Sequence, residues 1–514
     1  MPLRHLTPRD QALFWQYGRG PTVPVPDPLV HHAVERHAMA TPHAVAAEHR
    51  GATITYGELN RYADGLAARL VREGVRPGDH VGLFAHRSIP LLVGLLGTLK
   101  AGAAYVPQDI GLAPAAQLGH VMRAAATRVV LTLSEHAHRV PRQQGVRLIA
   151  LDEPAAYEGG PMAPEGAPPT VGVRPDDGCY VLFTSGTTGP PNGVEVTHRN
   201  VANLLFTGPG GLGVRPGERV AQLLNIAFDM AAWEILGCLT HGGTLVIRGK
   251  DIAEAARTAD VLIATPTVLS GIDPASCPRI RTVAVAGEPC PRPLADRWAG
   301  HAAFHNCCGP TETTIVNTMR RHRPSDALLT IGRPTPNNTV YVLDEHRRPV
   351  PIGAVGEMWA GGDCVSAGYL GNERLNAERY APDPFLGGDR RMFRTRDLGR
   401  WTPGGDLEHL GRTDDQVKVR GFRVELDSVS AILESVTGCA RAVTLRRDAR
   451  TLVSFVCPAD VDPEKARGAV AAALPYYCVP SEVLPLAFLP ETDRGKIDKG
   501  ALLRLAEQRE VVPR

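Results

Sequence analysis

The sequence predicts an α/β protein with parallel sheets, and three observations support this prediction. Helix-like residues 62–72 precede strand-like residues 80–85, and the same order returns in residues 91–99 and 104–106. This alternation is typical of parallel strands joined by crossover helices. The chain has 514 residues, enough for two to four domains, and a hydrophobic content of 43% that can fill large cores.

Composition argues against several classes of protein. The 56 basic and 54 acidic residues balance without a long block of one sign, so we expect no nucleic-acid or membrane-surface partner. Residues 1–19 lack the apolar core of a signal peptide, and the apolar run 91–99 is too short to span a bilayer. The ten cysteines form no C-x-x-C pair and no Cys/His cluster at zinc spacing. We therefore expect a soluble, cytoplasmic protein that acts on small molecules.

Two composition breaks indicate the domain organisation. Residues 153–169 are rich in Pro, Gly and Glu, which predicts an exposed loop. The second break covers residues 404–415, and about a hundred residues with their own strand and helix patterning follow it. We place the main boundary at Asp414, which gives a domain of residues 1–413 and a domain of residues 414–514.

Residues 180–198 run from a β-branched and aromatic strand into a loop of hydroxyl residues and glycines. Hydroxyl groups and a backbone that folds back on itself can direct several donors at one anion. The pattern favours a phosphate-binding loop with polyphosphate as its ligand, although an ordinary surface turn can have the same composition. The candidate residues are Thr184, Ser185, Gly186, Thr187, Thr188 and Gly189.

Further motifs follow one another along nearly the whole chain. They are T-Y-G-E-L from Thr55, L-K-A-G-A-A-Y-V-P from Leu99, F-D from Phe228, N-C-C-G-P-T-E-T-T from Asn306, I-G-R-P from Ile331, G-E-M-W-A-G-G from Gly356, F-R-T-R-D-L from Phe393, G-R-T-D-D-Q-V-K-V-R-G-F-R-V-E-L from Gly411, L-P-Y-Y-C-V-P from Leu474 and R-G-K-I-D-K from Arg494. In this order they resemble the motifs of the adenylate-forming enzymes, and within them the amino-acid adenylation domains of nonribosomal peptide synthetases.

The resemblance implies a fold and a reaction. The fold would be a large N-terminal domain of parallel-rich sheets with helices and a small distorted barrel, plus a small mobile α+β C-terminal domain. The active site would lie between the two domains. ATP would activate an α-amino acid to aminoacyl-AMP with release of pyrophosphate, and a carrier-protein phosphopantetheine thiol would then accept the acyl group. Two anions must meet in the first step, so Mg²⁺ and a lysine are expected to neutralise them.

The resemblance also assigns nucleotide contacts. Glu312 would hold Mg²⁺ and Thr311 would contact phosphate, which suits an oxygen-rich, partly hydrated ion. Asp397 would accept from both ribose hydroxyls, Asn306 would read the adenine edge, and Arg412 would steady the ribose or phosphate side. Each residue taken alone is equally compatible with a solvated surface position.

Other positions are implied for catalysis and for the second step. Lys496 would bridge the substrate carboxylate and the phosphate as a movable charge, and Gly287 is a further ATP-binding position. Asp414 occupies the hinge, and Lys418 and Gly421 would face the active site after the C-terminal domain has rotated. The alternatives are a loop lysine and plain strand and turn residues.

The substrate pocket implied by the resemblance has one acid. Asp229 would pair with the α-amino group, and none of the other lining positions is acidic. Burying a polar side chain without a partner costs about 1 to 3 kcal/mol, so we expect a hydrophobic substrate. The alanines suggest a deep pocket for an aromatic or large branched side chain, although Met230 intrudes. The remaining positions are Trp233, Ala264, Ala284, Ala286, Cys307, Ile315 and Val316, with Lys496 on the carboxylate side.

Three residues depart from the family pattern. Asn192 stands where a lysine is usual, Cys308 replaces an aromatic residue beside the adenine, and Arg396 replaces the glycine before Asp397. These changes raise a rival interpretation, a homologue that binds nucleotide or amino acid without catalysis. Retention of Lys496, together with Glu312 and Asp397, argues against it.

Chain length suggests partners. Eighteen residues follow Lys496, too few for a carrier domain, and the segment before Thr55 is too short for a condensation domain. We expect a stand-alone adenylation enzyme that loads a separate carrier protein, with an MbtH-type helper as a possible requirement. A carboxylate–CoA ligase of the same superfamily is the other rival, and Asp229 disfavours it.

Overall fold

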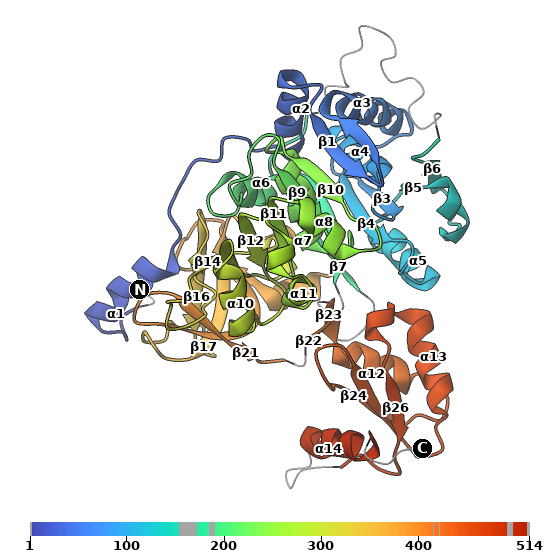
Figure 1. Ribbon diagram of the computed structural model, residues 1–514. Coiled ribbons are helices and arrows are strands. Elements are labelled where there is room, and N and C mark those ends of the chain that lie inside the picture. The colour runs from blue at the N-terminus through green and yellow to red at the C-terminus, as the bar shows by residue number, and fades with distance from the viewer. Residues whose placement is uncertain are drawn as a thin grey trace.

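The computed structural model describes residues 3–153, 172–184, 191–414, 416–420, 422–490 and 497–510. Three sheets and their helices form the first part of the chain, and a smaller α+β unit follows, drawn in orange to red in Figure 1. The predicted α/β class is therefore confirmed.

One sheet has nine strands in the order β15-β14-β13-β12-β11-β9-β10-β1-β2. Its central strands are parallel, whereas β2, β14 and β15 pair antiparallel at the two edges. The strands are β1 (Val45–His49), β2 (Ala52–Thr55), β9 (Arg219–Gln222), β10 (Thr244–Ile247), β11 (Val261–Ala264), β12 (Thr282–Val285), β13 (Ala303–Cys308), β14 (Thr318–His322) and β15 (Arg333–Pro334).

A second sheet has seven strands in the order β18-β8-β7-β4-β3-β5-β6. The run from β7 to β6 is parallel, and β8 and β18 complete it antiparallel. The strands are β3 (His80–Ala85), β4 (Ala104–Asp109), β5 (Val129–Thr132), β6 (Arg147–Ala150), β7 (Gly178–Thr184), β8 (Asn192–Thr197) and β18 (Gly368–Tyr369).

The third sheet is antiparallel and has five strands. Its order is β16-β17-β20-β19, with β21 paired to β20, and it stands where the small barrel is expected. The strands are β16 (Asn338–Leu343), β17 (Gly356–Gly362), β19 (Tyr380–Pro382), β20 (Arg391–Trp401) and β21 (Leu407–Arg412).

Helices join the two large sheets into one hydrophobic core. Helix α4 contacts β3 and β4 of the seven-stranded sheet and β1 of the nine-stranded sheet, and it packs along α3. The helices of this part are α1 (Pro8–Gly18), α2 (Val30–Ala40), α3 (Tyr56–Arg72), α4 (Ile89–Lys100), α5 (Ala115–Ala124), α6 (His198–Phe206), α7 (Asp229–Leu239), α8 (Ile252–Thr258), α9 (Pro266–Ser270), α10 (Arg292–Ala299) and α11 (Glu373–Arg379), with 3₁₀ turns η1 (Ser134–Arg139), η3 (Pro274–Ser276) and η4 (Thr311–Thr313).

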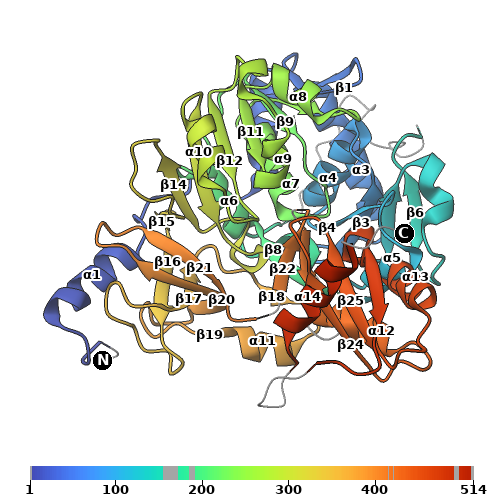
Figure 2. The same cartoon turned by 60° about the horizontal axis from the view of Figure 1, so that its bottom comes forward.

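The C-terminal unit has its own hydrophobic clusters, one around Val429 and Leu433 and another around Phe455 and Leu484. Figure 2 shows its helices beside β24 and β25. Its elements are β22 (Gln416–Val419), β23 (Phe422–Glu425), α12 (Leu426–Glu434), β24 (Arg441–Arg446), β25 (Leu452–Cys457), α13 (Pro463–Ala473), η5 (Tyr476–Cys478), β26 (Glu482–Pro485) and α14 (Lys499–Glu510). The boundary at Asp414 stays a prediction.

The elements expected from hydrophobic patterning are present. Residues 62–72 lie in α3, residues 80–85 form β3, residues 91–99 lie in α4 and residues 104–106 lie in β4. Nearly all of the predicted loop 153–169 lies outside the described residues. Within the parts of the chain that the structure describes, no helix has both the length and the apolar character needed to cross a membrane.

Two of the sequence motifs have structural roles. The T-Y-G-E motif is a capping box, in which the Thr55 side chain accepts from the Glu58 backbone and Glu58 accepts from Thr55 in return. The lysine of L-K-A-G is buried, and Nζ of Lys100 donates to Glu35 and Asp64 at 2.6 Å each. This ion cluster ties α4 to α2 and α3.

We expect Lys100→Met to lower the free energy of unfolding by about 3 kcal/mol, because it leaves the Asp64 carboxylate buried without its cation. Chemical denaturation followed by circular dichroism measures the change. The matched control is Lys465→Met on the exposed face of α13, which should shift stability by less than about 0.5 kcal/mol. Equal stability of the two variants would contradict a structural role for the cluster.

Candidate active site

A cavity of about 640 Å³ lies where all three sheets and the C-terminal unit meet. Several of its residues follow the carboxyl ends of parallel strands, as Ala286 follows β12. Ligands of α/β proteins commonly bind at such strand ends. The predicted site residues that line the cavity are Thr184, Asp229, Met230, Ala286, Gly287, Asn306, Cys307, Thr311, Ile315, Asp397, Arg412, Asp414 and Lys418.

Asp229 is the first residue of α7, where a carboxylate interacts favourably with the helix dipole. The Thr311 hydroxyl donates a hydrogen bond of 2.8 Å to its Oδ2. Burial raises the pKa of Asp229, while the Thr311 hydrogen bond and the nearby charge of Lys418 oppose that shift. Asp229 therefore offers the cavity a buried carboxylate that a ligand cation would stabilise.

Glu312 lies in the short turn η4 and is fully buried. Tyr369 donates to its Oε1 at 2.6 Å, and Nη1 of Arg423 lies 3.2 Å from Oε1 and 3.1 Å from Oε2. Burial alone would raise the pKa of Glu312, but Arg423, Arg379 and the Tyr369 hydroxyl outweigh it and hold the pKa at about 2. The side chain is therefore ionised at any physiological pH.

The chain turns sharply after Glu312. Thr314 and Ile315 adopt φ values of +56° and +69°, a left-handed conformation that is uncommon for β-branched residues. The turn brings both Thr311 and Ile315 to the cavity wall. Backbone strain of this kind costs about 1 to 3 kcal/mol per residue and is concentrated at functional sites.

Asp397 and Arg412 also line the cavity and face each other across the paired strands β20 and β21. Nη1 of Arg412 donates to Oδ1 of Asp397 at 2.6 Å, and Nε2 of His409 lies 3.4 Å from the same oxygen. Burial would raise the pKa of Asp397, but His409 and Arg412 lower it, so this carboxylate is also ionised. Asn306 lines the same region and donates to the Thr330 carbonyl at 2.8 Å.

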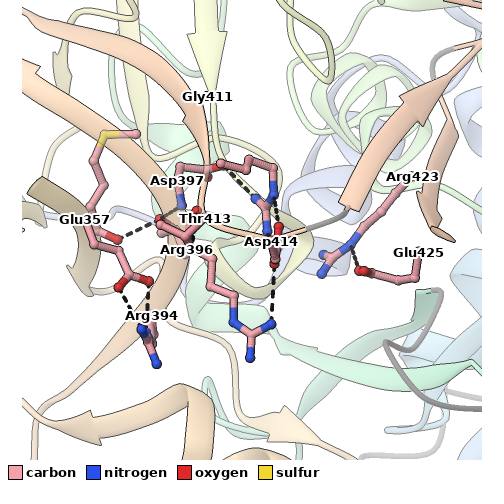
Figure 3. Close-up of polar contacts among 12 residues, drawn as sticks. Glu357, Arg394, Arg396, Asp397, Gly411, Thr413, Asp414, Arg423 and Glu425 are labelled. Carbon is pink, nitrogen blue, oxygen red and sulfur yellow. Dashed lines mark hydrogen bonds and ion pairs between the residues drawn. The ribbon is translucent and has the colours of Figure 1, made fainter. Parts of the chain in front are cut away.

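Asp414, the predicted hinge, is held between two guanidinium groups (Figure 3). Arg412 donates to both of its oxygens, at 2.7 and 2.9 Å, and Nη1 of Arg396 lies 3.5 Å from Oδ2. Arg396 also pairs with Glu378, and its carbonyl accepts from the Thr413 backbone at 2.9 Å. Charge from Arg412 and Arg396 lowers the pKa of Asp414 against the effect of burial.

Arg396 stands where the family usually has glycine, and its φ of +63° explains that preference. A side chain in the left-handed region costs about 1 kcal/mol relative to glycine. The two ion pairs of the guanidinium offset that cost.

The C-terminal unit also supplies cavity walls, through Lys418, Phe422 and Tyr477. The Phe422 ring lies 4.8 Å from that of Phe228 and stacks on Tyr477 at 4.2 Å. Burial lowers the pKa of Lys418, and Arg423 lowers it further, while Asp229 opposes the shift. The β22–β23 hairpin thus faces the cavity.

Four predicted pocket positions are buried but do not line the cavity. Trp233 donates from its indole nitrogen to the Gly210 carbonyl at 2.8 Å. The other three are Ala264, Ala284 and Val316. Of the three alanines that were expected to deepen the pocket, Ala286 alone lies at the cavity surface.

Two departures from the family pattern have different surroundings. Asn192 does not line the cavity and accepts from Asn372 at 2.9 Å. Cys308 lines the cavity, and burial raises the pKa of its thiol to about 12. The thiol replaces a flat aromatic surface beside Asn306.

Several predicted residues lie outside the described residues: Ser185, Gly186, Thr187, Thr188, Gly189, Gly421 and Lys496. Ile497, which follows Lys496, packs against the cluster around Phe455 and does not line the cavity.

Sequence reasoning named Thr311 and Arg412 but missed three other partners of the key carboxylates: Tyr369, His409 and Arg423. Arg423 lies within the motif that starts at Gly411, but the sequence does not indicate that it contacts Glu312. His409 and Tyr369 belong to none of the motifs above. Pairing of β18 with β8, and of β20 with β21, brings these two side chains to the site.

Comparison with known proteins identifies the family. Residues 34–370 match the model of the AMP-binding enzymes. Adenylate-forming reductase 06235 of Coprinopsis cinerea is 47% identical over 507 residues, which are 98% of this chain and 49% of the reductase. A linear gramicidin synthase of Brevibacillus parabrevis is 37% identical over 492 residues, which are 92% of this chain and 6% of the synthase. The chain spans about half the length of the two reductases it matches.

A solved structure shares the fold. It is the fused adenylation–PCP di-domain NpsA-ThdA from Klebsiella oxytoca, with a TM-score of 0.79 and 24% identity over 88% of this chain and 93% of that one. The chain therefore belongs to the AMP-binding enzymes, the adenylate-forming superfamily, and is of the adenylation-domain type found in nonribosomal peptide synthetases.

Proposed function

We propose that this chain uses ATP to activate the carboxyl group of a hydrophobic α-amino acid, forming aminoacyl-AMP and pyrophosphate. The phosphopantetheine thiol of a carrier protein then accepts the acyl group, in the biosynthesis of a nonribosomal peptide or a related natural product. Membership of the AMP-binding family supports the first step. Similarity to the linear gramicidin synthase supports the second.

The arrangement of charges in one cavity is the observation on which the proposal depends most. Asp229 supplies a carboxylate in a wall that also contains Met230, Ala286 and Ile315. Such a wall favours a ligand with one ammonium group and an apolar side chain. The Asp397–Arg412 pair in the same cavity suits a ribose, because ionised Asp397 has acceptor oxygens for two hydroxyl groups.

The reaction brings the substrate carboxylate to the α-phosphate of ATP, and cations must offset their repulsion. Arg412 and Lys418 line the cavity in the present arrangement. We assign Lys496 to the first step and Lys418 to the second. For Lys418 to replace Lys496 in the site, the chain must be divided as proposed here. Residues 1–413 then form the core, and residues 414–514 turn about Asp414.

Mg²⁺ is the expected counter-ion of ATP, and Glu312 is its expected ligand. Both oxygens of Glu312 already accept hydrogen bonds, from Tyr369 and Arg423, and the side chain has no exposed surface. The residues do not fit a bound Mg²⁺ as they are arranged here. Arg423 belongs to β23, so a turn of the C-terminal unit that withdraws it would free the carboxylate.

The two relatives that are 47% and 46% identical over 98% of this chain are named adenylate-forming reductases. Their similarity favours a second candidate function, in which the acyl group activated here is later reduced rather than joined in an amide. Under that candidate the substrate is an acid that need not carry an amino group.

We expect exchange of pyrophosphate into ATP to depend on one hydrophobic amino acid, with or without a helper protein. Asp229→Asn should lower kcat/KM for that amino acid by about 100-fold, since a buried ion pair loses one partner. The analogue of this amino acid that lacks the amino group should have the same kcat/KM with the parent protein and with the variant. Full activity of the variant with the amino acid would contradict the pocket assignment. Exchange only with acids lacking an amino group would favour the second candidate.

We expect Lys496→Ala to lower the exchange rate by about 100-fold or more while ATP binding is retained, because a charge that acts on the transition state is lost. Lys418→Ala should instead lower acyl transfer to a carrier thiol relative to exchange. Rapid-quench assays of the two steps make the comparison, with Lys499→Ala as the control. A Lys496 variant with the exchange rate of the parent would rule out the assigned role.

We expect Arg396→Gly to favour the first step over the second. The variant removes one cation from Asp414, so the present arrangement loses a contact worth about 1 kcal/mol or less. Glycine accepts the left-handed φ of this position, so the local backbone is not disturbed. The ratio of exchange to thiol transfer should rise up to about fivefold. Arg390→Gly, an exposed pair with Asp363, is the control. An unchanged ratio would show that Arg396 does not bias the hinge.

A further inference from the structure

A second cavity, of about 580 Å³, opens beside the active-site cavity and shares Arg87 and Arg248 with it. One wall carries His86, Glu135 and His136. Among the described residues, these three form the one group whose metal-ligand atoms lie within 4.8 Å of one another. The proposed adenylation chemistry uses none of them.

The fold brings the three side chains together from separate segments. Strands β3 and β5 are parallel neighbours in the seven-stranded sheet. His86 directly follows β3, and Glu135 with His136 lies in η1, which follows β5. Carboxyl ends of adjacent parallel strands meet at one edge of the sheet, so the two segments converge there.

Both segments are anchored. The backbone N–H of Ser134 donates to Oδ1 of Asp152 at 2.8 Å, which fixes the start of η1. Ser88 caps α4 and its hydroxyl donates to the His86 carbonyl at 3.2 Å. Ligand side chains on fixed backbone lose little freedom when they bind an ion.

Distances between the ligand atoms fit a tetrahedral ion. Nδ1 of His86 lies 2.8 Å from Nε2 of His136, and Oε1 of Glu135 lies 3.5 Å from Nε2 and 3.8 Å from Nδ1. Bonds of about 2.0 to 2.1 Å to a tetrahedral zinc ion place two ligand atoms about 3.3 Å apart. The three measured separations bracket that value.

Protonation also suits a metal ligand. Two imidazole nitrogens 2.8 Å apart must share one proton, with one donating and the other accepting. A metal ion that displaces this proton would use both lone pairs.

We propose that His86, Glu135 and His136 bind a divalent ion of the zinc type. Three protein ligands leave one position of a tetrahedron open. Arg50, Arg87, Arg248 and Lys250 line the same cavity and repel a bare dication, so they favour an anion in the open position. The inference does not depend on the proposed adenylation function.

Cobalt(II) titration of the chelator-treated full-length chain tests the site, because tetrahedral cobalt absorbs visible light far more strongly than the hydrated ion. We expect one equivalent to give the tetrahedral spectrum, and zinc to displace it. His136→Asn should weaken cobalt binding by about 100-fold, and Glu135→Gln by about 10-fold. Glu135 is exposed, so its replacement should leave the fold intact.

His138→Asn is the matched control, since His138 is exposed on the same turn and outside the cluster. It should bind cobalt as the parent does, and thermal unfolding in chelator checks that all variants are folded. Failure to form the tetrahedral spectrum, or equal affinity in His136→Asn, would overturn the proposal. So would binding of inorganic phosphate by chelator-treated protein that takes up no cobalt, which would identify an anion site.

Discussion

The guanidinium of Arg412 joins two carboxylates of the active-site cavity. It bonds Asp397 on β20 and, with its other nitrogens, both oxygens of Asp414 at the entry to the C-terminal unit. Asp397, the proposed ribose ligand, and Asp414, the proposed hinge, therefore share one cation. Any turn of the C-terminal unit about Asp414 must break or rebuild bonds to a residue that also contacts the nucleotide end of the cavity. Under the proposed rotation about Asp414, this side chain would couple the position of the C-terminal unit to the proposed nucleotide site.

Other charged side chains of the site are also paired with groups of the protein. Arg423 neutralises Glu312 from the C-terminal side, and Thr311 and Lys418 stabilise Asp229. Because buried charges without partners are costly, this arrangement is stable without a ligand. The proposed substrates would have to replace these internal partners, which would link their binding to the proposed movement of the β22–β23 hairpin.

Hydrophobic periodicity predicted the α/β class and the positions of β3, α4 and β4, since strand and helix periods follow directly from side-chain burial. The motifs located the cavity residues Asp229, Asn306 and Asp397, and also their partners Thr311 and Arg412, but not the contacts between them, because no local pattern encodes how distant segments pair. The depth of the substrate pocket was harder still to predict from the sequence. Trp233, Ala284 and Val316 turn into the core rather than the cavity, and a one-dimensional position cannot distinguish the two directions. The His86–His136 pair is also invisible in sequence, being fifty residues apart.

Three cysteines line the cavity in which an activated acyl group is proposed to form: Cys290, Cys307 and Cys308. A thiolate there would compete with the incoming carrier thiol and trap the acyl group on the enzyme. Burial raises the pKa of all three, to about 12 for Cys290 and Cys308, so at neutral pH they remain protonated. The protonated thiol is a poor nucleophile. Burial of these thiols in the cavity wall thus also keeps them from competing for the proposed acyl group.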